Sequence, residues 1–407
     1  MAMRPARICF PFTGDVVGGS HISVLGLVRH LDPDRFAPLV VPQYLDGAIA
    51  ALFRDAGVPT ETPLHWTELG YDKPVGPRQI ARVLRDIVPQ VRFLRQSGMD
   101  IVHTNDGRTH ATWGLPARLA GARLLWHQRG DPRALGLRLA APLLADRVVA
   151  VSRFALPGPG LWSAARKAQV VHSPFATDVA EDREAARRVI VAELGCAPDT
   201  AFVGYFGAFI ERKRPALFID AIADLARRTL SRPVMGLMFG EAYDGGQTEA
   251  RLVERARAHG AGDRVRLMGY RTPGTRGLAA CDMLMVTATG EPFGRTLIEA
   301  MLVGTPVVAT ASGGNAEALR DGRIGLLVPP EDAAALADAC VLLIERPGRA
   351  VRIAGEARAD ARVRFGEAMH ARRIAEVYEE MLRKSRRARA PAPIGQSLPT
   401  RDEGMST

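Results

Sequence analysis

The sequence predicts an α/β protein with two domains, each built on a parallel sheet. Short apolar runs alternate with stretches of helical periodicity from end to end, which is the pattern of βαβ units. A chain of 407 residues is too long for one compact core and suits two domains of ordinary size. The hydrophobic fraction of 47% is that of a globular protein, and no apolar run is long enough to span a membrane.

The apolar runs fall into two sets, which give the expected strands in order. The first set comprises residues 8–10, 39–41, 101–103, 124–126, 148–151 and 170–172. The second set comprises residues 202–206, 234–239, 265–268, 283–286, 307–309 and 325–328. Residues 173–200 separate the sets and contain Pro174, Pro198 and a charged run, so the domain boundary is expected there. We place the domains at residues 1–180 and 181–366, followed by a C-terminal helix over 367–385.

The last residues, 386–407, differ in composition from the rest of the chain. They are rich in Arg, Pro, Ser and Gly and lack a periodic apolar face. Such a segment buries too little apolar surface to offset its ordering entropy, so we expect a disordered tail.

Two glutamates, Glu291 and Glu299, mark the most informative stretch of the chain. Glu291 follows an expected strand and a small-residue turn, and Glu299 lies about two helical turns further on, so both can face one side of the same helix. Ligands of open parallel sheets bind at the carboxyl ends of strands. Two acids, a helix N-terminus and the Gly294 backbone suit a ligand with sugar hydroxyls and nearby phosphates. Alternatively, Glu291 only complements the helix dipole and Glu299 is a solvated surface residue.

Residues 290–309, Gly-Glu-Pro-Phe-Gly-Arg-Thr-Leu-Ile-Glu-Ala-Met-Leu-Val-Gly-Thr-Pro-Val-Val-Ala, resemble the E-x7-E signature of family 4 glycosyltransferases. Residues 150–154, 264–270, 313–317 and 325–330 also resemble family segments in the expected order. The resemblance implies a GT-B fold, in which two Rossmann-like α/β/α domains face each other across a cleft. It further implies a retaining transferase with an acceptor-binding first domain, a nucleotide-sugar-binding second domain and a C-terminal helix that crosses back to the first domain.

The resemblance assigns roles to the residues of the signature. Glu299 accepts hydrogen bonds from the ribose hydroxyls, and Glu291 contacts the donor sugar. The donor-binding positions that it implies are Gly18, Gly19, Gly207, Phe293, Gly294, Arg295, Thr296 and Glu299. Gly18 and Gly19 lie between an opening strand and a helix, where glycines allow the backbone to approach a diphosphate closely. Taken alone, the same glycines are more typical of a plain strand-to-helix turn.

A basic turn, Arg212-Lys213-Arg214, follows the strand and glycine at 202–207. It resembles the phosphate-binding loop of the family, in which a flexible ammonium group follows the charge of the leaving diphosphate. The family usually has an arginine directly after Gly207, where this chain has Ala208. Arg212 is therefore a candidate to supply the missing cation, and the alternative is a solvated basic turn.

His127 is the histidine that we select for the active site, because it follows the apolar run 124–126 at the end of an expected strand. The resemblance places a histidine here near the transferred sugar, where a neutral imidazole can hydrogen-bond a hydroxyl. The alternative is a histidine satisfied by the neighbouring backbone. No His–carboxylate cluster has metal-ligand spacing, so we expect neither a catalytic metal nor another cofactor.

Charge suggests a further partner. The formal net charge is +10, and Arg78, Arg82, Arg85 and Arg92 gather on one side of an amphipathic helix, opposite an apolar side of Ile80, Val83, Leu84, Ile87 and Leu94. Such a face suits an anionic membrane surface, although a solvated face is the ordinary interpretation. No aromatic stacking motif or helix-turn-helix pattern indicates nucleic acid. The scattered cysteines and the absence of a signal peptide favour a cytoplasmic protein, and the basic helix face favours a peripheral position on the inner face of the membrane.

The sequence thus predicts a retaining glycosyltransferase that moves a sugar from a nucleotide-diphosphate donor to a glycan, lipid-linked or small-molecule acceptor. Cell-surface polysaccharide or glycolipid biosynthesis is the expected setting. Two alternatives remain: a sugar-nucleotide 2-epimerase on the same scaffold, and a non-catalytic sugar-nucleotide-binding protein, which Ala208 suggests.

Overall fold

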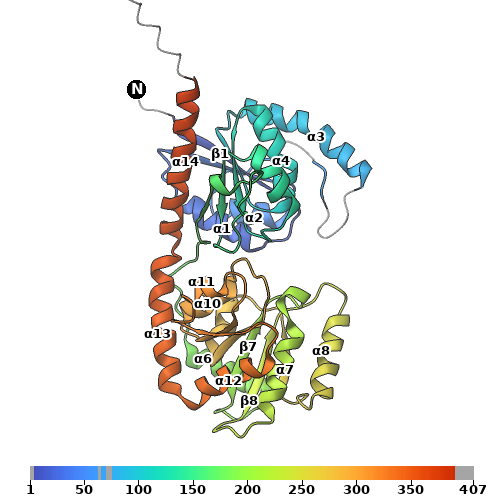
Figure 1. The fold of residues 1–407 in the computed structure, drawn as a ribbon, viewed down its shortest axis with the longest axis vertical. Coiled ribbons are helices and arrows are strands. Elements are labelled where there is room, and N and C mark those ends of the chain that lie inside the picture. Colours follow the sequence, from blue (N-terminus) through green and yellow to red (C-terminus); the bar gives the residue numbers. More distant parts are fainter. Residues whose placement is uncertain (1–3, 63–65, 70–75, 390–407) are drawn as a thin grey trace, which may run out of the picture.

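The computed structural model describes residues 4–62, 66–69 and 76–389, and its two parallel sheets confirm the predicted α/β class (Figure 1). Within these residues the first sheet has the order β2-β1-β3-β4-β5-β6 and the second β12-β11-β10-β7-β8-β9. The first contains β1 (Ala6–Phe12), β2 (Phe36–Pro42), β3 (Ile101–Thr104), β4 (Arg123–Gln128), β5 (Arg147–Ala150) and β6 (Ala168–Val170). The second contains β7 (Ala201–Phe206), β8 (Val234–Phe239), β9 (Val265–Gly269), β10 (Met283–Val286), β11 (Val307–Thr310) and β12 (Leu326–Val328).

Helices cover the first sheet and connect its parallel strands. They are α1 (Gly19–Arg29), α2 (Ala48–Arg54), α3 (Pro77–Gln96), α4 (Gly107–Ala120), the π-helical turn η1 (Gly136–Ala140), α5 (Ala141–Leu144) and the 3₁₀ turn η2 (Ala165–Lys167). The second sheet is covered by α6 (Arg183–Leu194), the 3₁₀ turn η3 (Glu211–Lys213), α7 (Pro215–Ala226), α8 (Gln247–Ala258), α9 (Gly274–Ala280), α10 (Arg295–Val303), α11 (Asn315–Ala318), α12 (Ala333–Glu345) and α13 (Pro347–Arg364).

Every apolar run predicted as a strand overlaps an observed strand. The least accurate is the run at 170–172, because β6 ends at Val170. Beyond it, the Val171 N–H still donates to the Ala150 carbonyl, and the His172 side chain contacts Glu317, with 2.8 Å between Nε2 and Oε1. The predicted run therefore continues two residues past the observed strand, to a residue that contacts the other half of the molecule.

The last helix, α14 (Glu367–Arg389), packs on the first sheet although α13 before it packs on the second (Figure 1). Its buried residues Ala371, Ile374, Val377, Tyr378 and Met381 share a core with Ile8 and Phe10 of β1. The helix continues past the predicted end at 385, so residues 386–389 of the expected tail are helical. The rest of that tail, 390–407, lies outside the described residues.

Helix α3 packs against the first half of the molecule along only part of its length. Asp86, Gln90, Phe93 and Leu94 are buried, whereas Ile80 and Leu84 are exposed. The apolar side named from the sequence is therefore buried at Leu94 and exposed at Ile80 and Leu84. Asp86 is stabilised in its buried position because its Oδ2 accepts hydrogen bonds from the backbone and the hydroxyl of Thr67, both at 2.6 Å. Apolar periodicity cannot register such a distant polar partner.

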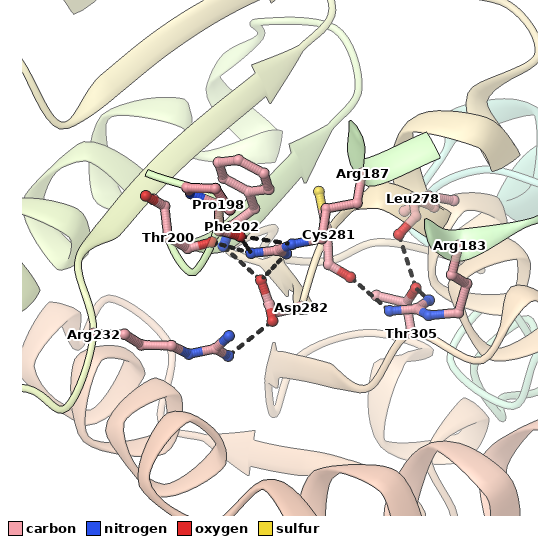
Figure 2. A network of polar contacts seen from close by, with 10 residues as sticks. All are labelled: Arg183, Arg187, Pro198, Thr200, Phe202, Arg232, Leu278, Cys281, Asp282 and Thr305. Carbon is pink, nitrogen blue, oxygen red and sulfur yellow. Dashed lines mark hydrogen bonds and ion pairs between the residues drawn. The ribbon is translucent and has the colours of Figure 1, made fainter. Parts of the chain in front are cut away.

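An arginine-rich polar network fixes α6 to the amino end of the second sheet (Figure 2). Asp282, directly before β10, accepts hydrogen bonds from Arg187 at 2.8 Å, from Arg232 at 2.8 Å and from the backbone N–H of Phe202 at 2.7 Å. Arg183 donates to the Thr305 hydroxyl at 2.5 Å and to the Cys281 carbonyl at 2.8 Å. The network ties β7, β10 and α6 together and so holds the strand that ends at the loop of Glu291.

Candidate functional site

Glu291 lies in the loop after β10 and is held between two cations. Its side chain is only 9% exposed, and its Oε2 is 2.5 Å from the Arg212 guanidinium and 2.9 Å from Lys213 Nζ. Burial raises the pKa of Glu291, but Lys213 and Arg212 outweigh it and leave the pKa below its ordinary value. The residue is therefore an ionised carboxylate at neutral pH.

The turn that carries the two cations is fixed to the loop of Glu291 by backbone contacts. The backbone N–H of Thr289 donates to the Arg212 carbonyl at 2.9 Å, and the Thr287 hydroxyl donates to the Lys213 carbonyl at 2.8 Å. Gly207 approaches from the end of β7 with φ +143°, and a β-carbon there would lie 3.5 Å from Lys213 Cε. The structure thus brings together three of the positions singled out from the sequence, Gly207, Arg212 and Lys213, around the fourth, Glu291.

Two glycines allow a second loop to press against this one. A β-carbon on Gly313 would lie 2.3 Å from the Glu291 carbonyl oxygen, and one on Gly314 would lie 2.5 Å from that of Pro292. The Gly314 N–H donates to the Glu291 carbonyl at 2.7 Å. Only glycine fits this close approach of two backbones, so the pair Gly313-Gly314 fixes where Glu291 stands.

Glu299 and Arg295 lie four residues apart on α10, with 3.6 Å between Arg295 Nε and Glu299 Oε1. Burial raises the pKa of Glu299, although Arg295 and Lys213 oppose the shift. Gly294 is the N-cap of this helix and Thr296 lies in its first turn. Phe293 is buried just before it, with its ring stacked 5.3 Å from that of His172. The signature therefore spans the loop that holds Glu291 and the helix that holds Glu299.

Arg295 connects the two halves of the molecule. Its guanidinium donates to the Ser23 hydroxyl of α1 at 3.2 Å and to the Pro174 carbonyl at 3.3 Å, and it stacks on Phe175 at 4.2 Å. A β-carbon on Gly19 would lie 2.6 Å from Arg295 Cδ. The start of α1, with Gly18 and Gly19, therefore faces the start of α10, as a shared ligand between the halves would require.

His127 is in a different environment from the one expected. Its side chain has no exposed surface, and its Nδ1 lies 3.0 Å from His103 Nε2 and 3.3 Å from the Arg129 guanidinium. His103 Nδ1 in turn lies 2.6 Å from the Tyr378 hydroxyl of α14. Burial, together with the charge of Arg129, lowers the pKa of His127 well below its ordinary value, so the ring is neutral. His127 closes a buried polar chain rather than lining an open surface.

Two residues that contact the regions described above, Arg129 and Glu317, were not singled out from the sequence. Arg129, two positions after His127, donates to Asn105 Oδ1 at 3.2 Å and to the Ser173 hydroxyl at 3.2 Å. Glu317 joins the halves, because its Oε2 accepts from the Arg153 N–H at 2.6 Å. The available signal for Arg129 was its place after a strand end, which it shares with His127. Glu317 ends the segment 313–317 that resembles the family, but nothing in the sequence indicates its contact with the distant Arg153.

The described residues contain no candidate metal site and no candidate membrane-spanning helix. In that part of the chain, no group of three or more His, Cys, Asp or Glu side chains is arranged to hold a metal ion. Among the helices of the same ranges, none combines the length and the apolar character needed to cross a bilayer.

The chain is similar in sequence to known glycosyltransferases. The profile of the family described as "Glycosyl transferases group 1" matches residues 187–360. The D-inositol 3-phosphate glycosyltransferase of Nocardia farcinica is 30% identical over an alignment that spans 98% of this chain and 92% of that protein. The lipopolysaccharide core biosynthesis mannosyltransferase LpsB of Rhizobium meliloti is 31% identical over 47% of this chain and 54% of its own length.

Solved structures share the architecture. The Anabaena protein HepE, in complex with UDP and glucose, superposes with a TM-score of 0.76 at 25% identity, over 91% of this chain and 99% of that one. The sucrose-phosphate synthase of Thermosynechococcus elongatus has a TM-score of 0.72 at 20% identity, over 93% and 100%. The GT-B architecture expected from the sequence is thereby confirmed.

Proposed function

Because this chain belongs to the group 1 glycosyltransferase family, we propose that it transfers a sugar from a nucleoside-diphosphate donor with retention of the anomeric configuration. The buried Glu291 between Arg212 and Lys213 carries the proposal. Cations held beside an ionised carboxylate can neutralise a departing diphosphate, while the carboxylate accepts hydrogen bonds from sugar hydroxyls. Family membership also favours transfer over the epimerase and non-catalytic alternatives.

The donor site extends along the second sheet. Glu299 accepts hydrogen bonds from the ribose hydroxyls, and the backbone of Gly207 and Gly294 leaves room for the diphosphate. Phe293, Arg295 and Thr296 complete the donor surface, and Gly18 with Gly19 faces it from the first half. Arg212 supplies the cation that the family usually places at the position of Ala208, since its guanidinium reaches the same Glu291 carboxylate as Lys213.

The acceptor site lies against the first sheet, on the side of His127. This residue has no exposed surface, so it supports the acceptor side through its neutral ring and its contact with Arg129. Catalysis arises from orientation of the two substrates and from stabilisation of the leaving group, with no covalent glycosyl-enzyme. The names of two relatives, an inositol phosphate glycosyltransferase and a lipopolysaccharide core mannosyltransferase, support an acceptor among small phosphorylated polyols or envelope glycans and a role in cell-surface polysaccharide or glycolipid biosynthesis.

A screen of nucleotide sugars tests the donor class. UDP is the first nucleotide to try, because the Anabaena protein was solved with it, and GDP is the second. The correct donor raises the melting temperature of the folded chain and releases its nucleotide when acceptor is present. In matched variants, Glu299→Gln weakens nucleotide binding, whereas Glu291→Gln chiefly slows transfer. Unchanged binding and turnover in both variants would refute the proposed site, and an inverted product anomer seen by NMR would refute retention.

We also propose that α3 brings the acceptor half onto an anionic membrane on the cytoplasmic side. Its exposed apolar residues, Ile80, Leu84 and Val88, are 50%, 57% and 64% exposed and stand beside the exposed Arg82 and Arg85. Each basic side chain near such a surface contributes about 1 kcal/mol, so several arginines suffice for weak, salt-sensitive binding.

Vesicle co-sedimentation tests this membrane contact. We expect binding to anionic vesicles at low salt, and loss of that binding when Arg78, Arg82, Arg85 and Arg92 are replaced together by glutamine. A separate Leu84→Ser variant tests the apolar stripe and lowers binding without changing the charge. Binding that survives the fourfold replacement contradicts the assignment to α3.

A further inference from the structure

A cavity of about 790 Å³ lies at the amino end of the second sheet. Its walls come from the start of β10, the end of α10, the end of α12 and one face of α13. This volume is within the usual range of small-molecule sites. Neither Glu291 nor Glu299 lines the cavity, because the loop of Glu291 and the helix after it follow the opposite end of β10. The cavity is therefore separate from the proposed donor site.

Apolar side chains from four elements line this cavity. Pro347, Val351 and Ala354 line it from successive turns of α13, so they share one face of that helix. The residues that line it from β10, α10 and α12 include Met283, Val303, Leu343 and Ile344. Val351 is 74% exposed, so part of this apolar face of α13 has no covering side chain among the described residues. Apolar walls of this kind are typical of sites that bind the apolar part of a ligand.

Two arginines reach the cavity at the turn that ends α10. Arg183 donates to the Thr305 hydroxyl at 2.5 Å and to the Cys281 carbonyl at 2.8 Å (Figure 2). Arg358 of α13 lies beside the neighbouring residue of the same turn, since a β-carbon on Gly304 would be 4.0 Å from Arg358 Cδ. Both arginines line the cavity, so its wall around residues 304 and 305 carries two positive charges.

No carboxylate of the described residues lies within ion-pairing distance of either arginine. The hydrogen bonds of Arg183 go to a hydroxyl and a carbonyl, and Arg358 makes no hydrogen bond within this part of the chain. The two acids in the cavity wall have other partners: two other arginines hold Asp282, and Ser231 donates to Glu345 at 3.0 Å. The positive charge of Arg183 and Arg358 is therefore left without a paired anion.

Arg358 also has a buried donor without an acceptor. Its Nε is buried and has no hydrogen-bond partner among the described residues. Further along α13, in contrast, Arg364 donates to Asp360 at 2.5 Å. A buried donor without an acceptor is destabilising, so an anionic ligand atom in the cavity is the expected acceptor.

We propose that this cavity binds an amphipathic anion, a single acyl chain with a carboxylate or phosphate head. The chain lies along the apolar face of α13, and the head accepts hydrogen bonds from Arg183 and Arg358. Pro347 and Arg358 are about 16 Å apart along the helix, so an extended chain of medium length spans the apolar wall and places its head at the arginines. Guanidinium groups match the geometry of both kinds of head.

The binding test uses the full chain and calorimetry, with every amphiphile below its micelle-forming concentration. Decanoate and decyl phosphate carry the two kinds of head, monodecanoylglycerol is the uncharged control, and acetate is the anion without a chain. We expect decanoate or decyl phosphate to bind at least about tenfold more tightly than either control, because only they fill both the apolar and the cationic part. The tighter of the two identifies the head.

The cationic end is tested by a pair of variants on α13. Arg358→Gln should weaken binding of the preferred anion about 10- to 100-fold, the usual loss for hydrogen bonds to a charged group. Arg362→Gln removes the same charge from an exposed position of the same helix that does not line the cavity, and should bind as the wild type does.

The apolar part is tested by a second pair, for which the helix leaves room. Gly355 lines the cavity, and a β-carbon there would have no atom within 4 Å, so Gly355→Leu should fold normally and fill the cavity. Gly348 is equally open but does not line the cavity, so Gly348→Leu is the matched control. We expect at least about a tenfold loss of decanoate affinity in Gly355→Leu only, with both variants melting no lower than the wild type.

Several results would overturn this inference. Equal binding of decanoate and monodecanoylglycerol would mean that the anionic head is not recognised. Wild-type affinity in Arg358→Gln or in Gly355→Leu would place the bound amphiphile elsewhere, and an equal loss in Arg362→Gln would reduce the effect to net charge. None of these measurements depends on turnover, so failure of the proposed transferase function would leave the assignment of this cavity standing.

Discussion

Strand β10 has a carboxylate at each end, and the two are held in different ways. Asp282 precedes the strand and Glu291 follows it, and each accepts from two cationic side chains. Asp282 also accepts a hydrogen bond from the backbone N–H of Phe202, and Arg187 donates in addition to the carbonyls of Thr200 and Pro198 (Figure 2). Arg212 and Lys213 have no side-chain partner other than Glu291 among the described residues, and Arg212 is 42% exposed.

The difference separates a structural ion-pair network from the proposed binding site, which is made of the same residue types. The arginines around Asp282 join segments of the fold, so their donors are used within the protein. The cations beside Glu291 have no other side-chain partner among the described residues, so we assign their remaining donors to the proposed diphosphate. Ion pairs alone therefore do not identify a functional site, and unused donor capacity beside a buried carboxylate is the feature that supports the proposed one.

The largest expected effect is on turnover at the Glu291 end. Lys213→Ala should lower the turnover number about 10²–10³-fold, the usual result of removing one stabilising donor from developing charge. Arg212→Ala should have a comparable effect because Arg212 replaces the cation absent at Ala208. Initial rates at saturating donor measure both, with Arg232→Ala at the Asp282 end as the control that keeps wild-type turnover.

Two outcomes would change this view. Wild-type turnover in Arg212→Ala would show that Arg212 does not replace the missing cation, while Lys213 could still act. Wild-type turnover in Lys213→Ala would show that the ion pairs at the Glu291 end of β10 are structural, like those at the Asp282 end.

The second largest expected effect is a loss of stability at the Asp282 end of β10. Asp282→Asn should lower the free energy of unfolding by about 2–3 kcal/mol, because hydrogen bonds from two arginines lose their charged acceptor. Turnover well below the melting temperature should stay within about twofold of wild type. Urea unfolding measures the free energy of unfolding, and initial rates measure turnover. Glu291→Gln is the reciprocal control, because it should slow transfer and keep the free energy of unfolding within about 1 kcal/mol of wild type. A stable but inactive Asp282→Asn variant would contradict the structural role.

The sequence predicted the sheets well because parallel strands buried on both faces are continuous apolar runs, as at β7 and β8. It also predicted that Glu291 lies in a loop after a strand and that Glu299 lies on the helix that follows, since a short signature encodes that loop and helix. It did not predict the burial of Asp86 in α3 or that of His127. Those depend on partners far away in the chain: Thr67 for Asp86, and Tyr378, through His103, for His127. Local periodicity contains no information about such pairs.

The smallest expected effect distinguishes the two glutamates of the signature by pH. Burial raises the pKa of Glu299 above its ordinary value of 4.5, whereas the nearby cations, against burial, hold that of Glu291 below it. As the pH falls, Glu299 is protonated first, and its neutral carboxyl then makes weaker hydrogen bonds to the ribose hydroxyls of the proposed donor. Nucleotide affinity is therefore complete above the pKa of Glu299 and falls as the pH drops through it, up to about tenfold per unit.

Calorimetric titration of UDP from pH 8 to pH 5 measures this dependence in three proteins. The nucleotide phosphate also titrates in this range, so the informative quantity is the difference between wild type and variant. Glu299→Gln has no proton to gain at this position and should show a flatter profile, with weaker binding at high pH. Glu291→Gln should keep the wild-type profile, because Glu291 is still ionised at pH 5. Identical profiles for wild type and Glu299→Gln would mean that the ribose carboxylate lies elsewhere, and that only the Glu291 end of the signature serves the donor.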